Sequence, residues 1–216
     1  MAVNAADDLT AWSLADDGSI SAVGGTYDAG QQTYAFDVVN GVTAIARFPF
    51  TDVVAGTWYY GAAAYAYNNG LFAGMTPTTF APNATMTRAM LVAVLHRLAG
   101  RPSVSGKMPF TDVASSTWYH DAVLWASQNG IVAGMSETTF APQENITREQ
   151  IVAIFSRYTA KFSPDKTEAA AELTGFADSA SVSDWALDDM KWAVAYKVIN
   201  GSPSAGKLYL LSLIHI

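Results

Sequence analysis

The chain of 216 residues contains no cysteine and only three histidines. Without cysteine, a disulfide framework and a thiolate metal site are both excluded. His96 falls in a predicted helix, His120 near a helix start and His215 in the terminal tail, and the adjacent His120 and Asp121 should point apart on a helix. Because HExxH, GxSxG and phosphate-loop patterns are missing as well, we expect no enzyme activity, no metal site and no cofactor.

Long apolar runs and an excess of basic residues are also missing. Half of the residues are hydrophobic, which suffices for a packed core, yet no apolar run approaches the length of a membrane span. The net charge is −7, and the acidic excess lies towards the two ends of the chain, so nucleic-acid binding is not expected. The first residues do not have the basic and apolar regions of a signal peptide. The chain is therefore either cytosolic or an internal fragment of a longer secreted protein.

What the chain does have is an internal repeat with an offset of 60 residues. The stretch Phe-Thr-Asp-Val at 50–53 recurs at 110–113, and Thr-Thr-Phe-Ala-Pro at 78–82 recurs at 138–142. A Trp-Tyr pair, an Asn-Gly pair, an Ala-Gly-Met triplet and a Thr-Arg pair recur at the same offset. A third, more divergent copy begins with Phe-Ala-Asp at 176–178 and stops before any Thr-Arg pair.

Each complete copy is predicted to form two helices joined by a glycine-rich connection. In the second copy, Thr117 can cap a first helix that runs from about 118 to 128 and ends at Asn129-Gly130. Trp125 falls on the apolar face of this helix, and Trp192 takes the matching place in the third copy. We therefore expect both tryptophans in the core.

The second helix of each copy is predicted to start at the Thr-Arg pair. Thr147 and Gln150 fit the capping box, in which the side chain of each residue bonds to the backbone N–H of the other. In the first copy Thr87 can cap the helix, but Met90 replaces the partner that would bond back. The stretches 97–110 and 161–176 are predicted linkers.

Both ends of the chain depart from the repeat. Residues 1–47 hold two strand-like runs separated by Asn40-Gly41, which predicts a β-hairpin, and we interpret this part as the end of an upstream β-rich domain or a linker. Residues 211–216 break the pattern abruptly, and their codons could match a transposon end used to prepare sequencing libraries. We expect them to derive from an adapter, the alternative being a genuine apolar C-terminus.

The repeated pattern resembles S-layer homology domains of bacterial cell-surface proteins. The resemblance rests on the Phe-Thr-Asp-Val, Trp, Asn-Gly, Phe-x-Pro and Thr-Arg elements and covers about three quarters of the chain. It implies a mainly α fold of tandem helix-loop-helix repeats packed around a pseudo-threefold helical core. On this basis the repeats span 48–102 (copy one), 103–163 (copy two) and 164–210 (copy three, truncated).

The resemblance also implies a function and a location. Grooves between neighbouring copies would bind an anionic, pyruvylated secondary cell-wall polysaccharide, and this would anchor an exported protein to the bacterial cell wall without a covalent bond. The protein would be extracellular, with no insertion into a membrane. The alternatives are a structural unit that self-associates in a surface layer, and the anchoring fragment of a secreted glycan hydrolase.

The Thr-Arg pairs are the first candidate site. The family's Thr-Arg-Ala-Glu motif maps onto 87–90 and 147–150, where Thr-Arg is kept and the final glutamate is not. Arg88 and Arg148 stand at predicted helix N-termini, where guanidinium and backbone N–H groups together favour an anion. The alternative is a solvated arginine without a ligand. Because copy three has no counterpart, at most two grooves should have their arginine.

Three further residue types recur once in each copy and are candidates for glycan contact. They are Trp58, Trp118, Trp185, Asp52, Asp112, Asp178, Gly74, Gly134 and Gly201. The tryptophans could stack on sugar rings or anchor the first helices, and the aspartates could bond sugar hydroxyls or form local turns and caps. The glycines would permit positive φ or a close approach of the backbone to a ligand.

Overall fold

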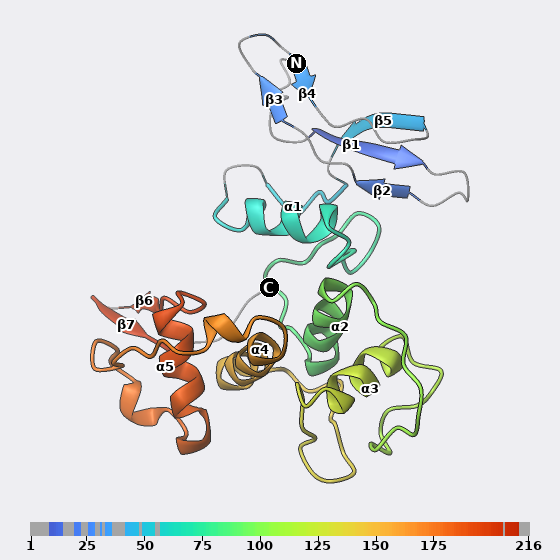
Figure 1. Cartoon of the computed structure of the whole chain (residues 1–216). Coiled ribbons are helices and arrows are strands. Elements are labelled where there is room, and N and C mark those ends of the chain that lie inside the picture. Colours follow the sequence, from blue (N-terminus) through green and yellow to red (C-terminus); the bar gives the residue numbers. More distant parts are fainter. Residues whose placement is uncertain are drawn as a thin grey trace. The chain divides into compact units, whose positions relative to one another are not determined.

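The computed structural model describes residues 9–14, 20–22, 26–28, 31, 33–35, 42–47, 49–54, 57–204 and 206–211. It divides into two compact units, 1–84 and 85–216, each of which is described by itself. Helices dominate the repeats and short strands precede them (Figure 1), so the predicted mainly α fold is confirmed. The pseudo-threefold packing of the copies stays a prediction from the resemblance.

The N-terminal part of unit 1 holds two small antiparallel sheets. The strands are β1 (Leu9–Leu14), β2 (Ile20–Ala22), β3 (Thr26–Asp28), β4 (Thr33–Ala35) and β5 (Val42–Arg47). One sheet has the order β2-β1-β5 and the other consists of β3 and β4. Among the described residues β5 pairs with β1 and β4 pairs with β3, while most of the first run of the predicted hairpin lies outside the described residues. The Asn40-Gly41 pair lies outside the described residues.

The first half of copy one completes unit 1. Helix α1 (Tyr60–Asn68) follows the Phe-Thr-Asp-Val stretch, and a loop returns the chain to the start of the copy. Phe50 is the centre of this small core, with ring centroids 4.9 Å from Tyr67 and 5.2 Å from Phe80. Both contacts are edge-on, the arrangement that aromatic rings favour.

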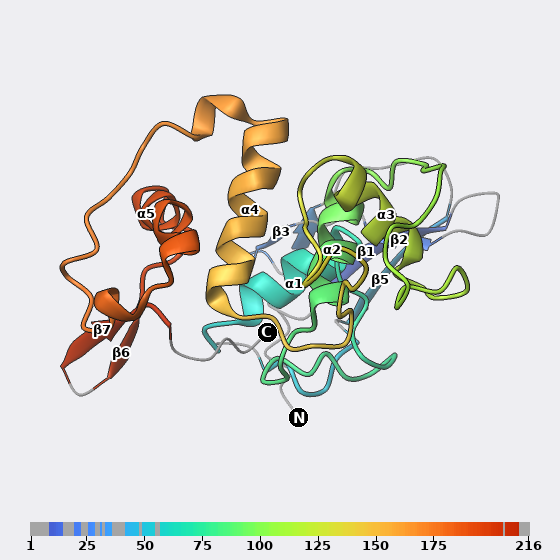
Figure 2. The same ribbon diagram turned by 90° about the horizontal axis from the view of Figure 1, so that it is seen from below.

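Unit 2 contains the remaining helices. They are α2 (Arg88–Leu98), α3 (His120–Gln128), α4 (Arg148–Phe162) and α5 (Leu187–Ala195), with three-residue turns η1 (Pro164–Lys166), η2 (Ser179–Ser181) and η3 (Asp184–Ala186). A hairpin of β6 (Ser202–Ser204) and β7 (Lys207–Tyr209) follows. Helix α2 packs against α3 and α4 packs against α5, as both views show (Figures 1 and 2). The second helix of one copy thus covers the first helix of the next.

Each of these helix pairs is centred on a buried aromatic residue. Trp125 of α3 is buried in the first cluster and Trp192 of α5 in the second, which confirms their predicted place in the core. Phe140, from the Thr-Thr-Phe-Ala-Pro loop of copy two, is completely buried in the first cluster. None of the helices in the described part of the chain is both long and apolar enough to cross a membrane.

The predicted helix starts are confirmed for the second helices. Thr147 and Gln150 form the complete capping box, and Thr87 accepts a bond from the N–H of Met90 at 3.3 Å. The cap predicted at Thr117 is wrong, because α3 begins at His120 and the hydroxyl of Thr117 donates instead to the carbonyl of Ala114. That hydrogen bond closes a turn before the helix.

The expected separation of His120 and Asp121 is also wrong. Nδ1 of His120 lies 2.9 Å from Oδ1 of Asp121 in the first turn of α3, where few neighbouring side chains confine the exposed carboxylate. The described residues contain no group of three or more histidine and carboxylate side chains that could hold a metal ion.

The residue that follows the first helix is strained in copy three. Gly70 and Gly130 lie two residues after the last residues of α1 and α3, with φ of 63° and 68°. Lys197 takes the same place after α5, with φ of 57°.

A side chain disfavours that conformation by about 1 kcal/mol, so Lys197→Gly should raise the free energy of unfolding by about that amount. Urea unfolding measures the change. Lys191→Gly, inside α5, is the matched control and should lower stability by about 1 kcal/mol; a loss of stability in Lys197→Gly would contradict the prediction.

Candidate functional site

The aspartate of each copy holds the loop that contains Thr-Thr-Phe-Ala-Pro. In copy two, the two carboxylate oxygens of Asp112 accept hydrogen bonds from the N–H groups of Phe140 at 2.9 Å and Ala141 at 2.7 Å. Asp52 makes the same two bonds at the same distances with the loop of copy one. The partners are 28 and 29 residues away, so these aspartates tie the start of a copy to its own loop rather than cap a local turn.

The hydrogen bonds change the acidity of Asp52. Burial raises its pKa, but the N–H groups of Phe80, Ala81 and Asp52 itself outweigh burial, and the pKa lies below its ordinary value of 3.8. The carboxylate is therefore charged at neutral pH, and its two oxygens are engaged by the protein backbone.

Copy three repeats this contact with a different sequence. Asp178 accepts hydrogen bonds from the N–H groups of Leu210 and Leu211, each at 2.8 Å. Leu211, the first residue of the stretch that we expected to derive from an adapter, thus takes the place of Ala141. The rest of that stretch, 212–216, lies outside the described residues.

The arginine of the first Thr-Arg pair reaches into the following copy. Arg88 is only 4% exposed, and its Nε donates to the carbonyl of Phe140 at 2.9 Å while Nη2 donates to that of Ala133 at 3.0 Å. Its guanidinium also lies 4.7 Å from the centre of the Phe140 ring. Phe140 is therefore held by Asp112 through its N–H and by Arg88 through its carbonyl.

Arg148 makes the corresponding contact between copies two and three. Its Nη1 donates to the carbonyl of Leu210 at 3.2 Å and its Nη2 to the hydroxyl of Ser202 at 2.9 Å. Burial lowers the pKa of both Arg88 and Arg148, and the negative charges of Asp112 and Asp178 oppose this shift. Both guanidinium groups remain charged at neutral pH.

The backbone N–H groups at the start of α2 are also engaged by the protein. The N–H of Arg88 donates to the carbonyl of Glu144, and that of Ala89 to the carbonyl of Pro142, each at 3.0 Å. The prediction that these N–H groups would bind an anion is therefore wrong for α2, because copy two supplies their acceptors.

The recurring glycines make room for the phenylalanine that opens each copy. A side chain at Gly134 would place its Cβ 2.7 Å from the ring of Phe110 and also against the carbonyl of Ser136. Gly74 and Gly201 lie against the matching rings and have φ of 82° and 80°. The close approach that we expected at these glycines is thus made by the protein's own aromatic rings.

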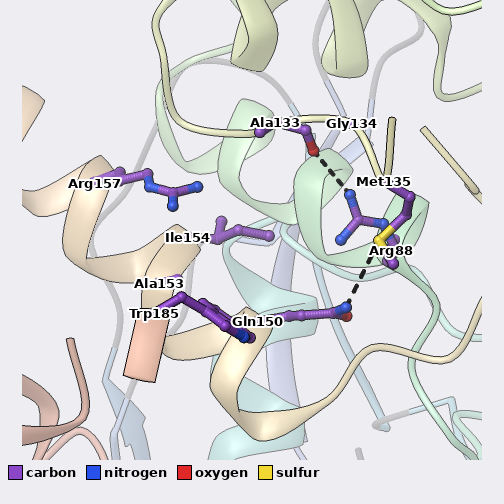
Figure 3. A pocket seen from close by; sticks show the side chains of 9 residues that line it. All are labelled: Arg88, Ala133, Gly134, Met135, Gln150, Ala153, Ile154, Arg157 and Trp185. Atoms are coloured by element: carbon purple, nitrogen blue, oxygen red, sulfur yellow. Dashed lines mark hydrogen bonds between the residues drawn. The ribbon is translucent and has the colours of Figure 1, made fainter. Parts of the chain in front are cut away.

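Three copies contribute side chains to one open cavity of about 500 Å³ in unit 2 (Figure 3). It is lined by Arg88, Ala133, Gly134, Met135, Gln150, Ala153, Ile154, Arg157 and Trp185. The guanidinium groups of Arg88 and Arg157 extend into it from opposite sides. Trp185 is 55% exposed, so much of its indole surface is available to a ligand.

Arg157 is a candidate site residue that the sequence analysis did not single out. Its side chain is exposed and has no hydrogen-bond or ion-pair partner among the described residues, in contrast to Arg88. It lies in the third turn of α4, outside the motifs from which the site was predicted. The repeat could have pointed to this residue, since Arg97 matches Arg157 at the same offset of 60 residues.

A smaller cavity of about 260 Å³ lies beside Trp118. It is lined by Ala93, His96, Arg97, Arg101, Trp118, Asp121 and Ala122. Burial and the neighbouring charge of Arg101 both lower the pKa of Arg97. Arg97 and Trp118 thus line one cavity, as Arg157 and Trp185 line the larger one, and in each case the arginine comes from the second helix of one copy and the tryptophan from the next copy.

Comparison with known proteins identifies the repeats. The family model of the S-layer homology domain matches residues 49–89, 109–152 and 175–205, which together exceed half of the chain. The chain belongs to the S-layer homology domain family. S-layer homology domains anchor proteins to the cell wall and are not catalytic, so this chain is an anchoring part of an extracellular protein of the cell surface.

Similar proteins include both enzymes and surface-layer proteins. An endoglucanase of Bacillus sp. (strain KSM-635) is 32% identical over 155 residues, which cover 72% of this chain and 16% of the relative. An amylopullulanase of Thermoanaerobacterium thermosulfurigenes is 30% identical over 84% of the chain and 10% of the relative. The surface-layer 125 kDa protein of Lysinibacillus sphaericus is 33% identical over 65% of the chain and 11% of the relative. The chain thus spans less than a fifth of each of these proteins.

The S-layer homology repeats bring only some of the predicted contact residues together. Arg88, Gly134 and Trp185 line the larger cavity and Trp118 lines the smaller one. The remaining candidates lie elsewhere. They are Arg148 and Asp178 at the end of copy three, Asp52, Asp112, Gly74 and Gly201 at the loops, and Trp58, 83% exposed in unit 1.

Proposed function

We propose that this chain binds an anionic secondary cell-wall polysaccharide and so anchors the protein to which it belongs without a covalent bond. The observation that carries the proposal is the larger cavity, which is lined both by Arg157, without a partner among the described residues, and by the exposed indole of Trp185. None of the residues that line this cavity carries a carboxylate.

The chemistry of the cavity suits a sugar that bears a carboxylate, such as a pyruvyl ketal. The planar guanidinium of Arg157 can donate two parallel hydrogen bonds to a carboxylate. The indole of Trp185 offers a flat apolar surface with one donor, which fits the face of a pyranose ring. Since the whole chain carries a charge of −7, attraction of an anion depends on such local cations rather than on the surface as a whole.

The two arginines of the larger cavity take different roles in this proposal. Arg88 has hydrogen bonds to two carbonyls and holds the loop of copy two, whereas Arg157 faces the ligand. Arg148 and the three aspartates likewise support the loops. The cavity at Trp118 forms a second, related site, so two weak contacts on one polymer chain can combine into firm attachment.

Purified cell-wall sacculi of a Gram-positive bacterium test the proposal. The chain should sediment with native sacculi, and binding should be lost once the secondary polymer has been extracted with acid. The released polymer should compete with the sacculi for the chain. Equal binding before and after extraction would overturn the proposal, and concentration-dependent assembly without sacculi would favour a surface-layer role instead.

A further inference from the structure

Copy two is joined to copy three by a carboxylate that the glycan site does not itself use. In the first turn of α4, Oε1 of Glu149 accepts a hydrogen bond from the N–H of Ser183 at 2.7 Å. Its Oε2 accepts a second bond from the hydroxyl of Ser183 at 3.2 Å. Both donors of one residue are therefore held by a single charged side chain.

These two hydrogen bonds act on the segment that carries Trp185. Ser183 is the residue immediately before the short turn η3, whose middle residue is Trp185. The next residue, Ala186, is completely buried. The turn is thus held on one side by Glu149 and on the other by the core, and the indole between them borders the cavity.

Helix α4 therefore presents the cation and fixes the aromatic group of the same cavity. Arg157 lies two turns beyond Glu149 on this helix and lines the cavity with Gln150 and Ala153. Because Glu149 and Arg157 share this helix, the link between Glu149 and Ser183 ties the turn that carries Trp185 to the element that carries the guanidinium. Glu149 does not line the cavity itself, and its charge is engaged by two donors.

The other junction between copies does not have this link. The residue that matches Glu149 in copy one is Ala89, which is completely buried and has no side-chain acceptor. Ser116, which matches Ser183 two positions before the tryptophan, is exposed and has no hydrogen-bond partner among the described residues. The segment before Trp118 is therefore not tied to the preceding copy by the pair of side-chain hydrogen bonds that ties the segment before Trp185.

We infer that Glu149 is a positioning residue that fixes Trp185 over the larger cavity, and that this cavity is preorganised for a sugar ring to a degree that the cavity at Trp118 is not. The inference rests on the proposed function, because its consequence for binding requires a glycan ligand. A rigid indole loses less conformational freedom on binding, which raises affinity without any new contact.

The test combines a measurement without ligand and one with sacculi. The whole chain is labelled with fluorotryptophan, and the signal of Trp185 is assigned with Trp185→Phe. In Glu149→Ala we expect the fluorine signal of Trp185 to shift while that of Trp118 stays in place, and binding to native sacculi to weaken about tenfold. Glu149→Gln should restore most of the binding, because its amide oxygen can still accept from Ser183.

Glu144→Ala is the matched control, since it removes the same charge from an exposed side chain that lines neither cavity. An unchanged Trp185 signal in Glu149→Ala, or equal weakening by Glu144→Ala, would overturn the inference. If the wild-type chain fails to bind sacculi, the proposed function is wrong, and the fluorine signal then decides by itself whether Glu149 positions Trp185.

Discussion

Replacing Arg157 by alanine is expected to weaken binding to native sacculi by roughly tenfold to a hundredfold, the size of effect that loss of a hydrogen-bonded charge pair produces. The side chain has no partner in the described part of the protein, so the free energy of unfolding should change by less than about 0.5 kcal/mol. Sedimentation with sacculi measures the first quantity and urea unfolding the second.

Two further variants sharpen this result. Lys161→Ala removes a cation from the same helix, four residues further on, where the side chain does not line the cavity. It should bind as the wild type does, which separates a local contact from a general effect of charge. Arg157→Lys should fall between wild type and alanine, because an ammonium group cannot form the two parallel bonds of a guanidinium. Equal losses in Arg157→Ala and Lys161→Ala would refute a specific role for Arg157.

Replacing Arg88 by alanine is expected to lower the free energy of unfolding of unit 2 by about 3 kcal/mol. The variant loses two charge-assisted hydrogen bonds and leaves the carbonyls of Phe140 and Ala133 without their donor in a buried place. It also removes the cation above the Phe140 ring. Urea unfolding followed by tryptophan fluorescence measures the loss.

The matched control for Arg88→Ala is Arg157→Ala, which makes the same change of residue and charge in the same cavity. A loss below about 1 kcal/mol in Arg88→Ala would show that the contact between copies is dispensable. Arg88→Lys should recover only part of the stability, because a single ammonium group reaches the two carbonyls less well than a planar guanidinium does. Together the two alanine variants separate the effect on the stability of the chain from the effect on its affinity for sacculi.

The structural role of Arg88 also explains why the Thr-Thr-Phe-Ala-Pro loop and the Thr-Arg pair recur together. The loop delivers Phe140 to the core, and Asp112 and Arg88 hold the backbone of this residue from two different copies. The same contact recurs at Leu210 with Asp178 and Arg148. In this protein the Thr-Arg pair is first of all a connection between neighbouring copies.

Sequence patterns were enough to predict the elements whose causes are local. The offset of 60 residues located two helices in each complete copy, and the capping box at Thr147 and Gln150 formed as predicted. Helical spacing placed Trp125 and Trp192 in the core. These features depend on residues within one or two turns of each other, so a pattern of residue types is enough to predict them.

The contacts of the repeated polar residues could be identified only from the tertiary structure. Arg88 bonds to Phe140 across 52 residues, and Arg157 and Trp185 line one cavity because α4 packs against the turn and the first helix of the following copy. From the sequence pattern we expected Arg88 to bind an anion, and the pattern did not single out Arg157. Whether a charged side chain is buried and hydrogen-bonded depends on which copy lies beside it. This is a property of the packing between repeats, and the sequence motif inside a single repeat does not contain it.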